Sequence, residues 1–143
     1  YRFAAIPSSY VTAVALADRF SVLSPTNTGL AVPSMLRVYG LEQHLASVRS
    51  IELPVVDLRS NLQVLKELML EQGKRAVEED GAQVIVPGCG EIYGIAGDLT
   101  AALGVPVLDP RAVVMGFTEM LIGMTLTHSK RAYPRPPEKR REL

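Results

Sequence analysis

Short apolar runs alternate along this chain with longer segments in which apolar residues recur at helical spacing. The run 83–86 is apolar after its first residue, as in a strand that is buried on both faces of a parallel sheet. The segment 61–79 instead repeats leucine, methionine and valine on one helical face and ends before Asp80-Gly81. The alternation of these two kinds of segment predicts parallel β–α units.

The same pattern predicts five strands and five helices in a single domain. The strands are expected at residues 3–6, 20–23, 48–53, 83–86 and 105–108, and the helices at residues 7–18, 32–39, 61–79, 91–103 and 111–126. The predicted fold class is therefore α/β, an open parallel sheet with helices on both faces. Ligands of such sheets bind beyond the carboxyl ends of the strands, where this prediction places the loops 24–29 and 87–90.

Charge and hydropathy exclude two classes of partner. The chain has 15 lysine and arginine residues and 15 aspartate and glutamate residues, so no net charge draws it to nucleic acid or to a membrane surface. No apolar run reaches the roughly 18 residues of a membrane span, and no signal peptide is visible. We therefore expect a cytoplasmic protein that binds neither nucleic acid nor membrane.

The loop 87–90 contains Cys89, the one cysteine of the sequence, between two glycines. Because glycine has no side chain, Gly88 and Gly90 leave room for a small ligand to reach both the backbone and the sulfur. The helix predicted at 91–103 would place free N–H groups beside Cys89, which favours a thiolate and also suits a bound carboxylate. Such a thiolate can remove a proton from carbon or attack an electrophile. The alternative is an inert, buried structural cysteine.

Other catalytic chemistry has little support. His44 and His128 are the only histidines that could join Cys89 in a metal site, and zinc needs three or four ligands, so we predict no metal. A cysteine–histidine dyad is supported by composition alone. The sequence contains no Gly-x-Gly-x-x-Gly or Walker-type loop that would bind a nucleotide.

The loop 24–29 carries three hydroxyls and an amide ahead of another predicted helix. Ser24, Thr26 and Thr28, together with Asn27, could bind a carboxylate or a phosphate at that helix N-terminus. The same residue types cap helices and form turns in most proteins, and the sequence favours neither interpretation.

Five segments resemble, in order and spacing, the aspartate/glutamate/hydantoin racemase superfamily. They are Arg19-Phe20-Ser21-Val22, Tyr39-Gly40-Leu41, Asp80-Gly81-Ala82, Val86-Pro87-Gly88-Cys89-Gly90 and Leu103-Gly104-Val105-Pro106-Val107-Leu108-Asp109. The resemblance is greatest to the hydantoin and allantoin racemase branch and covers residues 3–130. It corresponds to the second half to two-thirds of a family member.

This resemblance implies a racemase that needs no cofactor and is built from two similar α/β lobes. Each lobe supplies one cysteine: one removes a proton from the substrate's chiral carbon as a thiolate, and the other returns a proton from the opposite face. Cys89 matches the second cysteine and Ser24 lies near the substrate-binding hydroxyls. The backbone of Gly90 would hold the carboxylate or ring carbonyl of a small-molecule substrate that carries a carboxylate or a ring amide. Further substrate contacts are expected at Gly88, Thr26 and Thr28.

The resemblance also implies a division of the chain. Residues 1–108 would form the α/β lobe that carries Cys89, residues 109–128 a C-terminal helix that packs on the missing or partner lobe, and residues 129–143 an extended tail. Family members usually form oligomers, so we expect a homo-oligomer. Met115, Met120 and Met124 offer either a contact face for it or part of the core.

Three features depart from the family pattern. The segment that would carry the first cysteine would precede Tyr1, and the chain opens without Met in a predicted strand, so we expect it to be part of a longer protein. Glu91 replaces a residue that is usually small, and its carboxylate would oppose ionisation of the neighbouring thiol. Pro110-Arg111 is unusual after Leu108-Asp109.

Two other functions stay open at this point. Decarboxylases and cis–trans isomerases that resemble this superfamily use a single thiol, either to protonate a carbanion or to add to a double bond. The one cysteine visible here fits them. The other hypothesis is a non-catalytic α/β binding or assembly domain with an inert Cys89.

Overall fold

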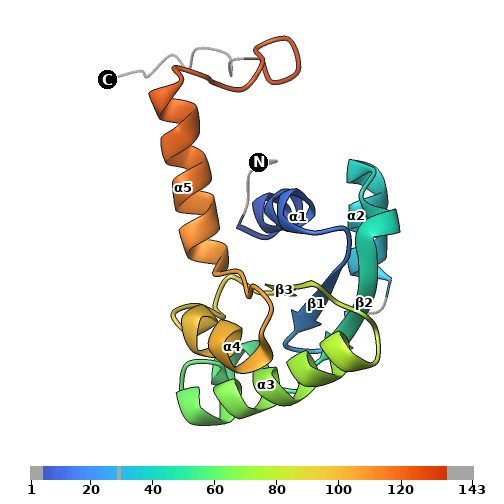
Figure 1. Cartoon of the computed structure of the whole chain (residues 1–143). Helices are drawn as coiled ribbons and strands as arrows, with labels where there is room; N and C mark the ends of the chain where they lie inside the picture. The colour runs from blue at the N-terminus through green and yellow to red at the C-terminus, as the bar shows by residue number, and fades with distance from the viewer. Residues whose placement is uncertain (1–4, 29, 135–143) are drawn as a thin grey trace.

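The computed structural model describes residues 5–28 and 30–134, which form a parallel sheet with helices on both faces (Figure 1). Within these residues the sheet has three strands in the order β2–β1–β3, which are β1 (Phe20–Ser24), β2 (Leu45–Ser50) and β3 (Val84–Pro87). The central strand, β1, pairs in parallel with both neighbours, so that Phe20 lies opposite Leu45 on one side and Val84 on the other. The predicted α/β class is confirmed.

Five α-helices lie in the described part of the chain. They are α1 (Ala5–Leu16), α2 (Ala31–Tyr39), α3 (Leu62–Glu78), α4 (Ala96–Leu103) and α5 (Pro110–Gly123), with 3₁₀ turns at Glu42–His44 and Val55–Asp57. α1 and α2 cover one face of the sheet, and α3 and α4 cover the other (Figure 1). α5 contacts α1 and extends beyond it (Figure 1). Among the described residues, no helix combines the length and the hydropathy needed to cross a membrane.

Alternate residues of the central strand build the two halves of the core. Phe20 and Val22 pack on the α1–α2 side, where Tyr10 of α1 stacks on the Phe20 ring. Leu23 points the other way and packs with Met69 of α3. All of β1 is buried, as expected of a strand with a helical layer on each side.

α3 follows its sequence pattern closely. The side chain of Asn61 caps the helix by accepting a hydrogen bond from the N–H of Val64 at 3.1 Å. Gly73 lies inside the helix, where it lowers helix propensity, and it is buried against α4. A Cβ atom there would lie 2.7 Å from Cδ1 of Leu103, so the glycine permits the close approach of α3 and α4.

The helix predicted at 91–103 is wrong in its first turn. α4 begins at Ala96, and residues 91–95 form an irregular loop instead. Gly94 has a φ of +74°, which breaks a helix, and its N–H donates to Oδ2 of Asp109 at 2.7 Å. The break is therefore stabilised by a side chain 15 residues further along the chain, which local apolar spacing does not reveal.

The predicted N-terminal strand at 3–6 is also wrong where it can be compared. Ala5 and Ile6 open α1, and residues 3 and 4 lie outside the described residues. Pro7 is tolerated because N–H groups in the first turn of a helix have no helical partner. The helix therefore begins before the proline rather than at it, and it ends at Leu16 rather than near Asp18.

The two remaining strand boundaries differ for reasons of pairing. β2 spans Leu45–Ser50 instead of 48–53, because its pairing with β1 runs from Leu45, opposite Phe20, to Ser50, opposite Ser24. Beyond the strand, the N–H of Ile51 donates to the carbonyl of Ser24 and the N–H of Leu53 to the carbonyl of Pro25. The strand predicted at 105–108 is reduced to one parallel bridge between Val107 and Ile85. α5 runs over Pro110–Gly123 rather than 111–126.

Candidate active site

The ends of β1 and β3 meet at the carboxyl edge of the sheet, where the sequence places the site. The N–H of Gly88 donates to the carbonyl of Leu23 at 2.7 Å, which extends the pairing of these strands by one residue. A Cβ atom on Gly88 would lie 3.3 Å from Cα of Ser24 and 3.1 Å from Cγ1 of Val22. A side chain at this position would require Val22 or the backbone of Leu23 and Ser24 to shift by a few tenths of an ångström, so glycine suits this close approach.

Cys89 is half-buried and opens a tight turn. Its carbonyl accepts from the N–H of Ile92 at 3.1 Å, and its sulfur accepts from the N–H of Glu91 at 3.5 Å. Because α4 begins only at Ala96, the expected helix N-terminus beside the sulfur is absent, and this prediction is wrong. A single N–H group of the turn takes its place as a donor that favours a charged sulfur.

Two hydroxyls, one at the end of β1 and one in the loop after it, are buried without a hydrogen-bond partner among the described residues. They belong to Ser24, which is 1% exposed, and to Thr28, whereas Thr26 is exposed. Leaving a buried hydroxyl unpaired costs on the order of 1–3 kcal/mol, so such groups are well placed to bind a ligand. At the start of α2 the cap residue, Leu30, makes no side-chain hydrogen bond, and the carbonyl of Thr28 accepts from the N–H of Ala31 at 2.9 Å.

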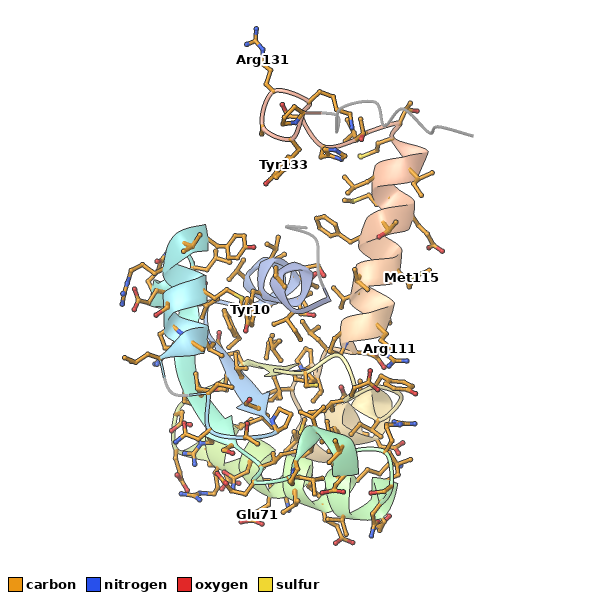
Figure 2. The ribbon with its side chains drawn as sticks, turned by 180° about the vertical axis from the view of Figure 1, so that it is seen from behind. Tyr10, Glu71, Arg111, Met115, Arg131 and Tyr133 are labelled. Atoms are coloured by element: carbon orange, nitrogen blue, oxygen red, sulfur yellow. The ribbon has the colours of Figure 1, made fainter. Side chains whose placement is uncertain are left out.

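Glu91 and Arg111, the two residues that we expected to depart from the family pattern, contact each other. The guanidinium of Arg111 lies 2.8 Å from Oε1 of Glu91, and its Nε donates to the carbonyl of Gly90 at 3.0 Å. The same guanidinium lies 3.6 Å from the centre of the Tyr93 ring. Figure 2 shows Arg111 at the base of α5, with Met115 further along the helix.

Asp109 fixes Arg111 in this position. Its Oδ1 accepts from the N–H groups of Arg111 and Ala112, which caps α5, while its Oδ2 accepts from Gly94. Arg59 approaches from the other side of the loop and donates to the carbonyl of Tyr93 at 3.2 Å. Sequence reasoning missed these contacts, although Asp-Pro before an apolar segment is a recognisable helix start.

Both histidines lie elsewhere. His44 shares a hydrogen bond of 2.8 Å with the carbonyl of Asp18 ahead of β2, at the opposite edge of the sheet from Cys89. His128 follows α5 and packs edge-on against Tyr133. The residues described here therefore give no support to a cysteine–histidine dyad. They also include no group of three histidine, cysteine or acidic side chains that could hold a metal ion.

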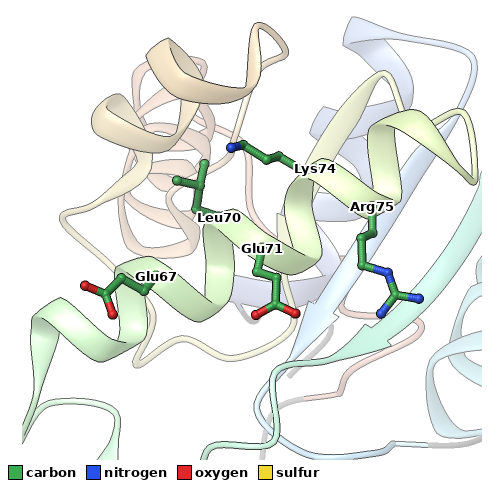
Figure 3. Close-up of a pocket in the computed structure, with 5 residues that line it drawn as sticks. All are labelled: Glu67, Leu70, Glu71, Lys74 and Arg75. Carbon is green, nitrogen blue, oxygen red and sulfur yellow. The ribbon is translucent and has the colours of Figure 1, made fainter.

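A shallow hollow on the protein surface lies apart from the Cys89 loop (Figure 3). One face of α3 lines it, with the residues Glu67, Leu70, Glu71, Lys74 and Arg75. Two acids and two bases at helical spacing are typical of a solvated helix surface. The hollow has no residue in common with the predicted site.

Residues 4–118 match the protein-family model described as Asp/Glu/Hydantoin racemase. The chain belongs to this family. It is 35% identical over 127 residues to a hydantoin racemase of Rhizobium meliloti, which covers 86% of this chain and 53% of the relative. It is 31% identical over 134 residues to a hydantoin racemase of Pseudomonas sp. (strain NS671), which covers 93% of this chain and 54% of the relative. The expected resemblance is confirmed.

Two solved structures of the family share the fold. The allantoin racemase from Klebsiella pneumoniae superposes with a TM-score of 0.86 at 33% identity and covers 95% of this chain. The allantoin racemase from Pseudomonas fluorescens gives a TM-score of 0.85 at 29% identity and covers 97%. The aligned part is 56% and 60% of those two chains, respectively. This racemase-family chain thus spans little more than half the length of the relatives described here.

Proposed function

We propose that this chain supplies one of the two acid/base cysteines of a racemase that needs no cofactor. The substrate is a hydantoin-like ring or an amino acid, and the reaction moves a proton at its chiral carbon. The observation that carries the proposal is the position of Cys89: its sulfur accepts the Glu91 N–H at the carboxyl edge of the sheet. The hydantoin and allantoin racemases among its relatives support this reading.

The chemistry needs a thiolate on one face of the substrate and a thiol on the other. In one direction the Cys89 thiolate takes the proton from the chiral carbon, and the opposite thiol delivers its own proton to the carbanion. In the reverse direction the two sulfurs exchange roles. The N–H of Glu91 donates to the Cys89 sulfur at 3.5 Å, a contact that a charged sulfur accepts more strongly than a neutral one.

The substrate's polar groups would be held by the neighbouring loops. Ser24 and Thr28 offer the buried hydroxyls that have no partner among the described residues, and Thr26 lies exposed in the same loop. Gly88 and Gly90 present only backbone beside the sulfur, so a carboxylate or a ring carbonyl can approach closely.

The second thiol is proposed to come from a second lobe. Residues 1–108 form the lobe with Cys89, and residues 109–128, which contain α5, pack on the second lobe. The exposed apolar residues of this segment support that arrangement, since Met115 is 59% and Ile122 is 71% exposed. A homo-oligomer and an extended tail at 129–143 remain predictions.

Loss of optical rotation tests this function. The purified protein, prepared together with the proposed second lobe, is incubated with an enantiopure 5-substituted hydantoin, with enantiopure allantoin and with an enantiopure amino acid. We expect one of them to racemise, with kcat reduced at least about 100-fold in Cys89→Ala. Arg37→Ala, which removes an ion pair on α2, is the control and retains the rate. Racemisation that persists in Cys89→Ala contradicts the proposal.

The single cysteine of the chain favours a second candidate, a one-thiol decarboxylase or cis–trans isomerase. Incubation with a substituted malonate and with maleate separates it from a racemase. Turnover of either compound that depends on Cys89, without any loss of optical rotation in the first assay, would favour the second candidate.

A further inference from the structure

Arg111 contacts the residues that follow Cys89 in three ways. Its Nε donates to the carbonyl of Gly90, its terminal nitrogen pairs with the carboxylate of Glu91, and its guanidinium covers the ring of Tyr93. The arginine comes from α5, a different element from the loop that it holds. Its position is therefore fixed by the start of the helix and not by the loop itself.

Glu91 acts on the sulfur in two opposite ways. Its backbone N–H donates to the sulfur at 3.5 Å, which favours a negative charge there. Its carboxylate belongs to the same residue, and an unpaired negative charge near the sulfur would disfavour a thiolate. Arg111 pairs with this carboxylate at 2.8 Å, so the second effect is offset while the N–H contact is kept.

The other charged groups at this loop are already occupied. Asp109 uses both carboxylate oxygens on backbone N–H groups, those of Gly94 and of the first turn of α5. Arg59 donates to the Tyr93 carbonyl and lies 4.0 Å from the centre of the Tyr93 ring. No second base is seen on Glu91 among the described contacts, so neutralising it falls to Arg111.

We propose that Arg111 is a positioning residue for Cys89, which neutralises the Glu91 carboxylate and holds the Gly90–Glu91 peptide so that its N–H meets the sulfur. This inference rests on the proposed function only in taking Cys89 as the reacting group.

Alkylation of Cys89 tests the inference on the thiol itself. The sulfur displaces iodide from neutral iodoacetamide or from anionic iodoacetate, and mass spectrometry of the Cys89 peptide follows the rate over a range of pH. Arg111→Ala should slow alkylation by iodoacetamide about two- to fivefold at neutral pH, the size expected of an exposed ion pair, and iodoacetate should be slowed more. The pH of half-maximal rate should rise.

Adding Glu91→Gln to Arg111→Ala should restore most of the rate and the wild-type ratio of the two reagents. A purely structural role for Arg111 predicts instead that both reagents slow equally and that the second change restores nothing. Equal slowing, or no slowing in Arg111→Ala, overturns the inference. Arg37→Ala, which breaks the exposed Arg37–Glu42 pair on α2, is the matched control and should leave both rates unchanged. If the protein shows the expected alkylation pattern but racemises none of the substrates, the proposed function is contradicted and this role of Arg111 is still supported.

Discussion

Arg49 and Asp80 are joined by two hydrogen bonds, from Nε to Oδ2 at 2.6 Å and from a terminal nitrogen to Oδ1 at 2.9 Å. The pair links β2, an outer strand of the sheet, to the second residue after the end of α3. Both side chains are largely buried, with exposed fractions of 14% and 20%. Ser47 also donates to Asp80, at 2.5 Å, so the carboxylate is well supplied with donors.

Removing this carboxylate should destabilise the fold. Asp80→Ala leaves the Arg49 guanidinium in a mostly buried position with only Glu79 to pair with, and we expect a loss of about 2–3 kcal/mol in the free energy of unfolding. Urea denaturation at neutral pH measures this loss. Glu42→Ala, which breaks an exposed pair with Arg37, should change the midpoint little, and equal effects of the two variants would contradict the argument.

The same pair should make stability sensitive to acid. Hydrogen bonds from Arg49 and from Ser47 hold the pKa of Asp80 below its ordinary value, against the opposing effect of burial. A lowered pKa in the folded state gives stability that is complete above the unfolded value of about 3.9 and is lost as the pH falls through the folded value. Between about pH 5 and about pH 2, the wild type should therefore lose more unfolding free energy than Asp80→Asn. If the unfolding free energies of the two proteins fall in parallel with pH, this carboxylate is not responsible for the sensitivity to acid.

Two buried serines on β1 should respond differently to loss of the hydroxyl. The Ser21 hydroxyl is 2.8 Å from that of Ser47, and Ser21→Ala should cost about 1 kcal/mol of unfolding free energy. Ser24 has no such partner among the described residues, so Ser24→Ala should leave stability unchanged or raise it. If Ser24 binds substrate, its variant should raise KM and Ser21→Ala should not. A thermal denaturation curve and a KM for each variant decide between these outcomes.

Gly88 should not tolerate a side chain. In Gly88→Ala the new methyl group would press on the backbone of Leu23 and Ser24, and we expect a cost of about 1–3 kcal/mol together with reduced activity. Gly97→Ala is the matched control, because Gly97 lies in α4 with no atom within 4 Å of the added position. That variant should stabilise α4 by up to about 1 kcal/mol. Similar loss of stability in both variants would contradict the close approach at Gly88.

Local patterns predicted the elements whose ends are encoded next to them. Asn61 caps α3 and Gly40 ends α2 with a φ of +69°, so both helices lie where the sequence places them. The predicted boundaries are wrong where a residue far away in the sequence determines the local backbone structure. Asp109 holds Gly94 in a non-helical conformation, and Ile85 provides the only pairing for the segment around Val107 among the described residues.

The close approach of the two predicted loops could be predicted for a topological reason. Carboxyl ends of adjacent parallel strands meet at one edge, which brings Ser24 beside Gly88 although 64 positions separate them in the sequence. The surroundings of Cys89 could not be predicted, because the helix expected next to it begins only at Ala96. An N–H group of the turn lies beside the sulfur instead. The contact between Glu91 and Arg111 was equally hidden, since each residue alone only departs from the family pattern.

Proton exchange with solvent tests most directly the claim that Cys89 is one of two acid/base groups. The protein is incubated in ²H₂O with one enantiomer of a substrate that it racemises, and both enantiomers are recovered early and analysed by mass spectrometry. With two thiols on opposite faces, the product enantiomer carries deuterium while the recovered substrate keeps its proton, and Cys89→Ala abolishes formation of the labelled product. Equal deuterium in both enantiomers, or labelled product formed at the wild-type rate by Cys89→Ala, would contradict the account.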